Sequence, residues 1–150
     1  GVEKSTKVKP RIVASALLEL IGDSSKIFIM GHKYSDLDAV GAAAGLVGAI
    51  RELDTGIKVR AAIDTEHTLA APIINRLTDN LHDEEDIFIT PDEALKELDE
   101  KTLLIIVDTN NKDFVESVEL YKAAKKIVVI DHHRQTVNYI DNYSDQIIVN

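Results

Sequence analysis

The sequence predicts an α/β protein with a doubly wound, mainly parallel sheet and helices on both faces. Short apolar segments alternate with helical patterns along the chain. Two of these segments, "TLLIIVD" and "KIVVID", are continuously apolar, as expected for strands that are covered on both faces. With 150 residues, 45% of them hydrophobic, the chain is long enough for one domain with a substantial core.

The first half of the chain alternates helix, strand and helix. Residues 1–10 are polar and basic, and are predicted to be a linker or a remnant of cloning, so the domain is expected to occupy residues 11–150. A helix is predicted over 11–21 and a buried strand over 26–30. A helix of small apolar residues follows, with Asp38 as its N-cap. We expect its glycines to permit close packing on the sheet rather than to contact phosphate.

The second half continues the same alternation. Thr90, Pro91 and Glu93 have the spacing of a helix N-terminus, with Thr90 as the cap. The remaining predictions are strands over 57–63, 86–89, 102–108 and 126–131, a helix over 71–78, and a helix that ends near "YKAAKK". The segment "DTEHT", residues 64–68, is predicted to be a solvated loop.

Composition excludes several classes of protein. No apolar segment is long enough to cross a membrane, and we expect no signal peptide. A net charge of -9 argues against binding long nucleic acid by phosphate neutralisation. The chain has no cysteine, so any metal would be bound by histidine and carboxylate groups.

Candidate metal ligands follow three of the predicted strands. They are His32, Asp36 and Asp38 after the first strand, Asp108 after the second, and Asp131, His132 and His133 at the end of the third. Sites in open parallel sheets lie beyond the carboxyl ends of the strands, so these groups are expected at one edge. Crowded carboxylates repel one another unless cations lie between them. This set of ligands suits Mn²⁺, or Fe²⁺, Co²⁺ or Zn²⁺, and predicts a two-metal hydrolytic centre bridged by Asp108.

Three motifs resemble those of the DHH phosphoesterases. They are "FIMGHKYSDLDAVGAA", "VDTN" and "VVIDHHR", and the resemblance covers the chain from about Lys7. Within that family, "FIMGHK", "ITPDEAL" and "VVIDHHR" are most similar to the cyclic di-AMP phosphodiesterases. The resemblance implies hydrolysis of cyclic di-AMP to linear pApA, by the cytoplasmic domain of a protein anchored in the cell membrane.

The resemblance also implies a role for each candidate residue. One Mn²⁺ would be held by His32, Asp36 and Asp108, and the other by Asp38, Asp108 and His132. Asp131 would orient a ligand histidine, and His133 would face the substrate phosphate. Lys33 and Arg134 are further candidates for phosphate contacts.

The resemblance extends to a region that these 150 residues do not contain. The family has a further aspartate ligand downstream and a second, substrate-binding domain. We therefore expect the chain to be one lobe of the catalytic unit, weak or inactive alone, with a cyclic dinucleotide as its substrate. A homodimer of the full-length protein is left open.

Two other kinds of function are compatible with the motifs. Relatives with this metal site act as exonucleases or oligoribonucleases on short strands, or as inorganic pyrophosphatases. A non-enzymatic module that binds a metal or a nucleotide is the second alternative. The intact set of candidate ligands disfavours such a module, because a degenerate domain would be expected to lack at least one of them.

Overall fold

A single mixed sheet organises the part of the chain that the structure describes. The computed structural model describes residues 2–7, 10–33, 37–53, 56–64, 87–107, 115–131 and 136–141. Within these ranges the strands are β1 (Val2–Lys7), β2 (Lys26–Met30), β3 (Lys58–Ala62), β4 (Phe88–Ile89), β5 (Thr102–Val107), β6 (Lys126–Asp131) and β7 (Thr136–Asp141). The helices are α1 (Pro10–Gly22), α2 (Leu37–Arg51), α4 (Pro91–Glu97) and α5 (Val118–Ala123).

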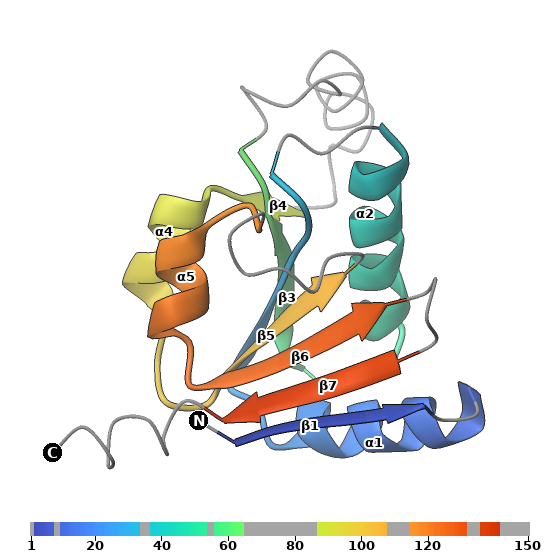
Figure 1. Ribbon diagram of the computed structural model, residues 1–150. Helices are drawn as coiled ribbons and strands as arrows, with labels where there is room; N and C mark the ends of the chain where they lie inside the picture. Colours follow the sequence, from blue (N-terminus) through green and yellow to red (C-terminus); the bar gives the residue numbers. More distant parts are fainter. Residues whose placement is uncertain are drawn as a thin grey trace, which may run out of the picture.

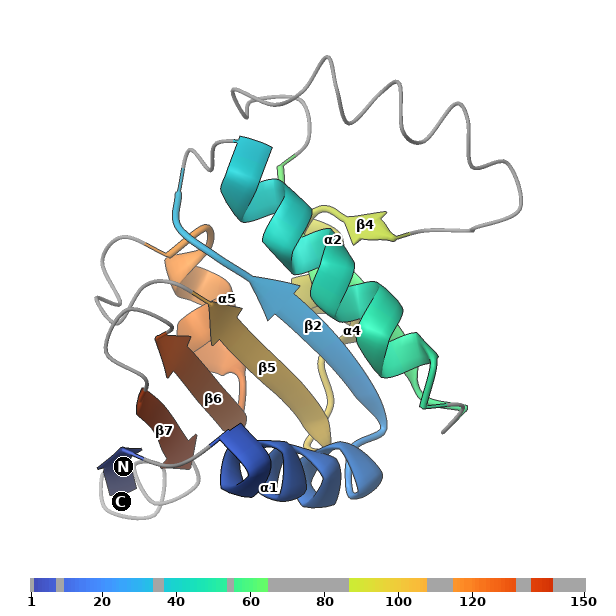
Figure 2. The same cartoon turned by 90° about the vertical axis from the view of Figure 1, so that its right-hand side faces the viewer.

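The predicted fold class is confirmed. The strand order is β1-β7-β6-β5-β2-β3-β4, and the strands from β6 to β4 are parallel to one another. Figure 1 shows α2 on one side of the sheet, with α4 and α5 on the other. In Figure 2, α2 crosses in front of the parallel strands, and α1 lies along the bottom of the view. None of the helices within the described ranges is long and apolar enough to cross a membrane.

The central strands are largely apolar, and helices cover both of their faces. On β2, Ile27 and Ile29 belong to the core shared with α1 and α2. Phe28 and Met30 alternate with them and belong to the core shared with α4 and α5. All six residues of β5 are buried. The continuous apolar segments in the sequence are therefore strands between two layers of helices.

The chain reverses its direction of travel across the sheet between β2 and β5. From β2 the chain passes through α2 to β3, on one side of β2. From β5 it passes through α5 to β6, in the opposite direction. Because β2 and β5 are neighbours, their carboxyl ends form a topological switch point, the place where open α/β sheets bind ligands.

The prediction that residues 1–10 form a linker is wrong for Val2–Lys7, which is strand β1. It pairs antiparallel with β7, which itself pairs antiparallel with β6. Neither β1 nor β7 was predicted from the sequence. The pairing of β1 with β7 satisfies backbone hydrogen bonds of both strands. The polar sequences of these strands give no continuous apolar run from which this pairing could be predicted.

The glycines of α2 do not pack on the sheet, so the prediction of close helix–sheet contact is wrong. The buried positions of this helix are Val40, Ala43, Val47 and Ile50, whereas Gly41, Gly45 and Gly48 are exposed. The larger side chains bury more apolar area, which sets the rotation of the helix. The helix also begins at Leu37, so Asp38 lies within its first turn rather than at its cap.

Helix α4 begins as its sequence predicts. Thr90 is the N-cap, and its Oγ1 accepts a hydrogen bond from the backbone N–H of Glu93 at 3.2 Å. Pro91 occupies the first helical position, where no backbone N–H is needed. The helix predicted over 71–78 lies outside the described residues.

Removing the cap of α4 tests this contact. Thr90→Ala is expected to lower the free energy of unfolding by about 1 kcal/mol, because the N–H of Glu93 loses its acceptor. Thr90→Ser, which keeps the hydroxyl, should stay close to the unsubstituted protein. Chemical denaturation followed by circular dichroism measures the difference. Equal stability of the alanine and serine variants would contradict the capping role.

Arg60 is a charged residue within the core layer between the sheet and α4. Its side chain is 7% exposed, and its Nη2 atom lies 2.7 Å from Oε1 of Glu97 at the end of α4. The guanidinium also lies 5.9 Å from the centre of the Phe28 ring. A buried guanidinium needs such a counter-charge, because leaving it unpaired in the core is costly.

The two partners of this ion pair should respond differently to substitution. Glu97→Gln is expected to destabilise the fold by about 2 kcal/mol, a value reduced because Glu97 is partly exposed. Arg60→Met removes the buried charge itself and should cost less, since methionine can pack against Phe28. Denaturant unfolding of both variants measures the order. A larger loss in Arg60→Met would show that the pair itself is a net source of stability.

Candidate metal centre

Three parallel strands end side by side at the switch point. In the ladder between β2 and β5, Met30 pairs with Ile106, and in the next ladder Val107 pairs with Ile130. In the sequence, the first candidate ligand follows two residues after β2, and Asp108 follows directly after β5. The strand ends that precede the three motifs therefore lie next to one another along one edge of the sheet.

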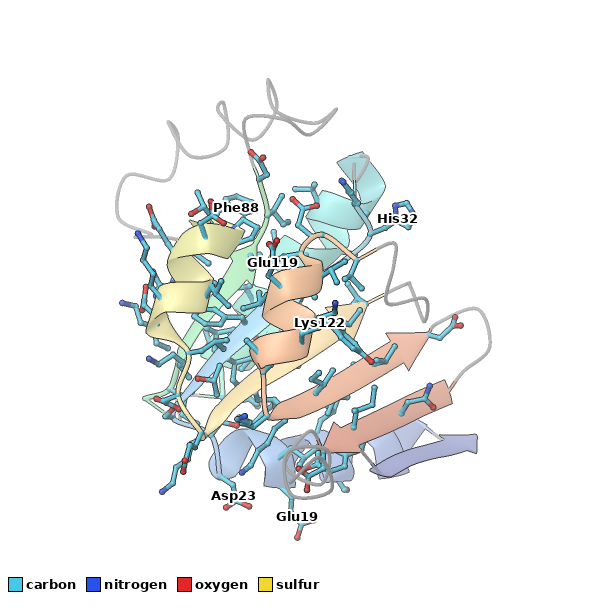
Figure 3. All side chains as sticks on the ribbon, turned by 60° about the vertical axis from the view of Figure 1, so that its left-hand side comes forward. Glu19, Asp23, His32, Phe88, Glu119 and Lys122 are labelled. Carbon is cyan, nitrogen blue, oxygen red and sulfur yellow. The ribbon has the colours of Figure 1, made fainter. Side chains whose placement is uncertain are left out.

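His32 lies at this edge and is exposed (Figure 3). It forms an isolated antiparallel bridge with Val115, a residue 83 positions later in the chain. Its Nδ1 atom is hydrogen-bonded to the backbone carbonyl of Lys33. Because a carbonyl only accepts, Nδ1 is the donor of this hydrogen bond, and Nε2 is the ring nitrogen suited to binding a metal.

Asp131 is the last residue of β6 and is half-buried. It pairs with Thr136, the first residue of β7, in the antiparallel ladder. Residues 132–135 connect the two strands in the sequence, so the triplet begins on the sheet and continues into this connection. Asp131 thus lies on a rigid element, as suits a residue that orients a neighbouring ligand.

The remaining predicted site residues are only partly within the described structure. Asp38 is the second residue of α2, and Lys33 is exposed beside His32. Asp36, Asp108, His132, His133 and Arg134 lie outside the described residues. Within the described residues no three histidine, aspartate or glutamate side chains form a metal-binding group. The full set of ligands therefore stays a prediction.

Two carboxylate residues at this edge were missed by the sequence analysis. Glu116 accepts a hydrogen bond on Oε1 from the backbone N–H of Asp64, at 2.6 Å. Its own backbone N–H donates to the carbonyl of Gly31, at 2.9 Å. Asp64 follows a strand, as the predicted ligands do, and is half-buried rather than fully solvated. No pattern in the sequence marks Glu116, because its contacts are with residues 52 and 85 positions away.

The electrostatic surroundings of Glu116 are mixed. Burial raises the pKa of its carboxyl above the usual value, and the charge of Asp64 acts in the same direction. The hydrogen bond from the Asp64 backbone and the charges of Lys33 and His32 lower the same pKa. Lys33 and His32 are therefore close enough to Glu116 to interact electrostatically with its carboxyl group.

Few of the predicted donors are within the described structure. His32 donates from Nδ1 to a carbonyl, and Asp131, which is predicted to orient a ligand, ends the strand next to β5. Imidazole and carboxylate groups without thiolate suit Mn²⁺ and similar ions. The described part of this edge therefore contributes one predicted imidazole ligand, and the rest of the centre stays a prediction.

Several known proteins are similar in sequence to this chain over nearly its whole length. A cyclic-di-AMP phosphodiesterase PdeA of Listeria monocytogenes is 33% identical over 142 residues, which are 93% of this chain and 21% of that protein. A cyclic-di-AMP phosphodiesterase GdpP of Geobacillus thermodenitrificans is 39% identical over 144 residues, with the same coverage. A membrane protein–large ribosomal subunit bL9 fusion protein of Onion yellows phytoplasma is 30% identical over 142 residues, 93% of this chain and 17% of that protein.

These relatives are much longer than this chain. The chain spans about a fifth of the length of the phosphodiesterases that it matches. The pattern of the family described as "DHH family, N-terminal domain" matches residues 26–149, which include all three motifs and every strand of the parallel part of the sheet. The chain therefore belongs to the DHH family.

Proposed function

We propose that this chain is the catalytic lobe of a metal-dependent phosphodiesterase that hydrolyses cyclic di-AMP to linear pApA. The observation that supports the proposal is that the carboxyl ends of β2, β5 and β6 lie side by side, and the residues that follow these strands contain the predicted ligands. The substrate is inferred from relatives that are named cyclic-di-AMP phosphodiesterases and are 33–39% identical.

The proposed centre holds two Mn²⁺ ions. The ligands would be His32, Asp36 and Asp108 for one ion, and Asp38, Asp108 and His132 for the other. When bound, the two cations would lower the pKa of a water molecule and polarise the phosphate. Nε2 of His32 is the atom that would bind, since its Nδ1 is engaged by a carbonyl.

The other residues of the site would orient ligands and bind the substrate. Asp131 would accept a hydrogen bond from a ligand histidine and fix its ring orientation. His133, Lys33 and Arg134 would contact the phosphate, to which cationic and N–H donors are suited. In the reaction, a water oxygen bonds to phosphorus, the bond from phosphorus to the ribose 3′ oxygen breaks, and that oxygen takes up a proton.

We infer that the complete enzyme is larger than these residues. The matching family pattern is that of an N-terminal domain, and the matched phosphodiesterases are about five times as long as the matched region. A downstream aspartate ligand and a substrate-binding lobe would complete the site. One relative is named a membrane protein fusion, which supports anchoring of the full-length protein at the cell membrane.

Substitution of the bridging aspartate tests the activity. In the full-length protein, Asp108→Ala is expected to lower the rate of cyclic di-AMP hydrolysis at least about a thousandfold, because both cations lose a shared ligand. Chromatographic detection of pApA measures the rate. Asp92→Ala, at an exposed position of α4, is the matched control and should retain the rate of the unsubstituted enzyme.

The same assay separates the proposed substrate from its alternatives. The unsubstituted enzyme should cleave cyclic di-AMP faster than pApA or pyrophosphate. Faster cleavage of pApA would favour an oligoribonuclease, and faster cleavage of pyrophosphate a pyrophosphatase. Undiminished hydrolysis by Asp108→Ala would contradict the bridging role.

Metal binding by the 150-residue chain tests whether the ligand set is incomplete. Calorimetric titration with Mn²⁺ is expected to show one site that is at least about tenfold tighter than the second, because the second ion lacks its downstream carboxylate. Asp36→Asn should abolish the tighter site. Two tight and equivalent sites would contradict the assignment of a missing ligand.

A further inference from the structure

The segment that precedes α5 returns to the edge where the predicted metal ligands lie. Val115 is 2% exposed and forms the isolated bridge with His32. The next residue, Glu116, donates its backbone N–H to the carbonyl of Gly31 at 2.9 Å. Both residues that follow β2 are therefore held by residues 115–116, which are distant from them in the sequence.

Glu116 also contacts the end of β3. Its Oε1 atom accepts the backbone N–H of Asp64 at 2.6 Å, and Asp64 lies two residues beyond β3. The ladder between β2 and β3 ends at the pair formed by Ile29 and Ala61. Beyond that pair, Glu116 joins the two strand ends, with its backbone bonded to one and its side chain to the other.

Joining the two strand ends through a glutamate side chain has a cost in free energy, because the carboxylate is partly removed from water. Glu116 is half-buried, and burial raises the pKa of its carboxyl. A buried carboxylate is unfavourable unless hydrogen bonds or cations compensate for its lost hydration. The bond from Asp64 and the nearby charges of Lys33 and His32 act in that direction. A side chain chosen only for packing would not incur this cost.

We propose that Glu116 is a positioning residue of the metal centre, which fixes the backbone that carries His32 by joining the ends of β2 and β3. The inference rests on the proposed function, since it assigns His32 to a metal. A ligand held in place before the metal arrives loses less conformational freedom on binding. The Oε1 acceptor, rather than the negative charge, is the part of the side chain that makes the bond to Asp64.

Three variants of the full-length protein separate hydrogen bonding from charge and from general surface effects. Glu116→Ala removes both the acceptor and the charge. Glu116→Gln keeps an oxygen acceptor without the charge. Glu119→Ala removes an exposed glutamate on the first turn of α5 (Figure 3) and is the matched control.

The first measurement is Mn²⁺ affinity by calorimetry. Glu116→Ala is expected to bind Mn²⁺ about tenfold more weakly, as is typical when a residue that supports a metal ligand is lost. Glu116→Gln should remain within about threefold of the unsubstituted protein, because its amide oxygen can accept the same N–H. Glu119→Ala should not change the affinity. A merely structural role would lower stability without separating the glutamine variant from the alanine variant in metal affinity.

The second measurement requires no metal. Hydrogen exchange of the Asp64 amide in the metal-free protein should become faster in Glu116→Ala but not in Glu116→Gln, because only alanine removes the acceptor. Should Glu116→Ala fail to fold, Glu116→Asp replaces it. Aspartate keeps the charge but its shorter side chain does not reach Asp64, so the same loss of Mn²⁺ affinity is expected.

The outcomes distinguish this inference from the proposed function. Unchanged Mn²⁺ affinity in Glu116→Ala, or equal losses in the alanine and glutamine variants, would overturn the positioning role even if cyclic di-AMP is cleaved. If the unsubstituted protein binds Mn²⁺ but does not cleave cyclic di-AMP, the substrate is wrong and the Glu116 comparison still stands. If it binds no Mn²⁺, both proposals are overturned.

Discussion

The parallel pairing of β2 with β5, and of β5 with β6, is the constraint on which the candidate site depends. The three strands end at nearly the same height in the sheet, because Met30 pairs with Ile106 and Val107 pairs with Ile130 near their carboxyl ends. Strand ends that precede motifs about 25 to 100 residues apart in the sequence thereby lie along one edge. The packing of the core and the positions of the predicted ligands depend on the same strand register. A shift in that register would move both the buried apolar residues and the residues that follow the strands.

The two edges of the sheet are built differently. At the amino ends of the strands, Ser25 and Lys26 bind Asp99, and Nζ of Lys26 also donates to the carbonyl of Glu97. The hydrogen bond from Ser25 is the main reason why the pKa of Asp99 is lowered. At the carboxyl ends, burial instead raises the pKa of Glu116. Hydrogen bonds and an ion pair therefore stabilise the charged form of Asp99 at the amino ends of the strands. At the carboxyl ends, burial disfavours the charged form of Glu116, and carboxylates with raised pKa values are common at functional sites.

Much of the fold was predictable because its signals are local. The strands 26–30 and 126–131 and the Thr90 cap agree with the structure, since continuous apolar runs and capping residues act within a few positions. The pairing of β1 with β7 was not predictable, because a polar edge strand is defined by its partner. The direction in which the α2 glycines face also depended on which side of the helix buried the larger residues.

Some residues of the candidate site could be predicted from their neighbours in the sequence, whereas others depend on contacts with distant residues. A strand followed by a histidine or aspartate is visible in the sequence, and this rule located His32 and Asp131 at the edge that the structure describes. Applied to β3, the same rule would also have identified Asp64. Glu116 follows no strand and reaches the edge only because Val115 pairs with His32. A residue that holds other residues in place gains its role from the fold, so sequence patterns identify candidate ligands more readily than the groups that position them.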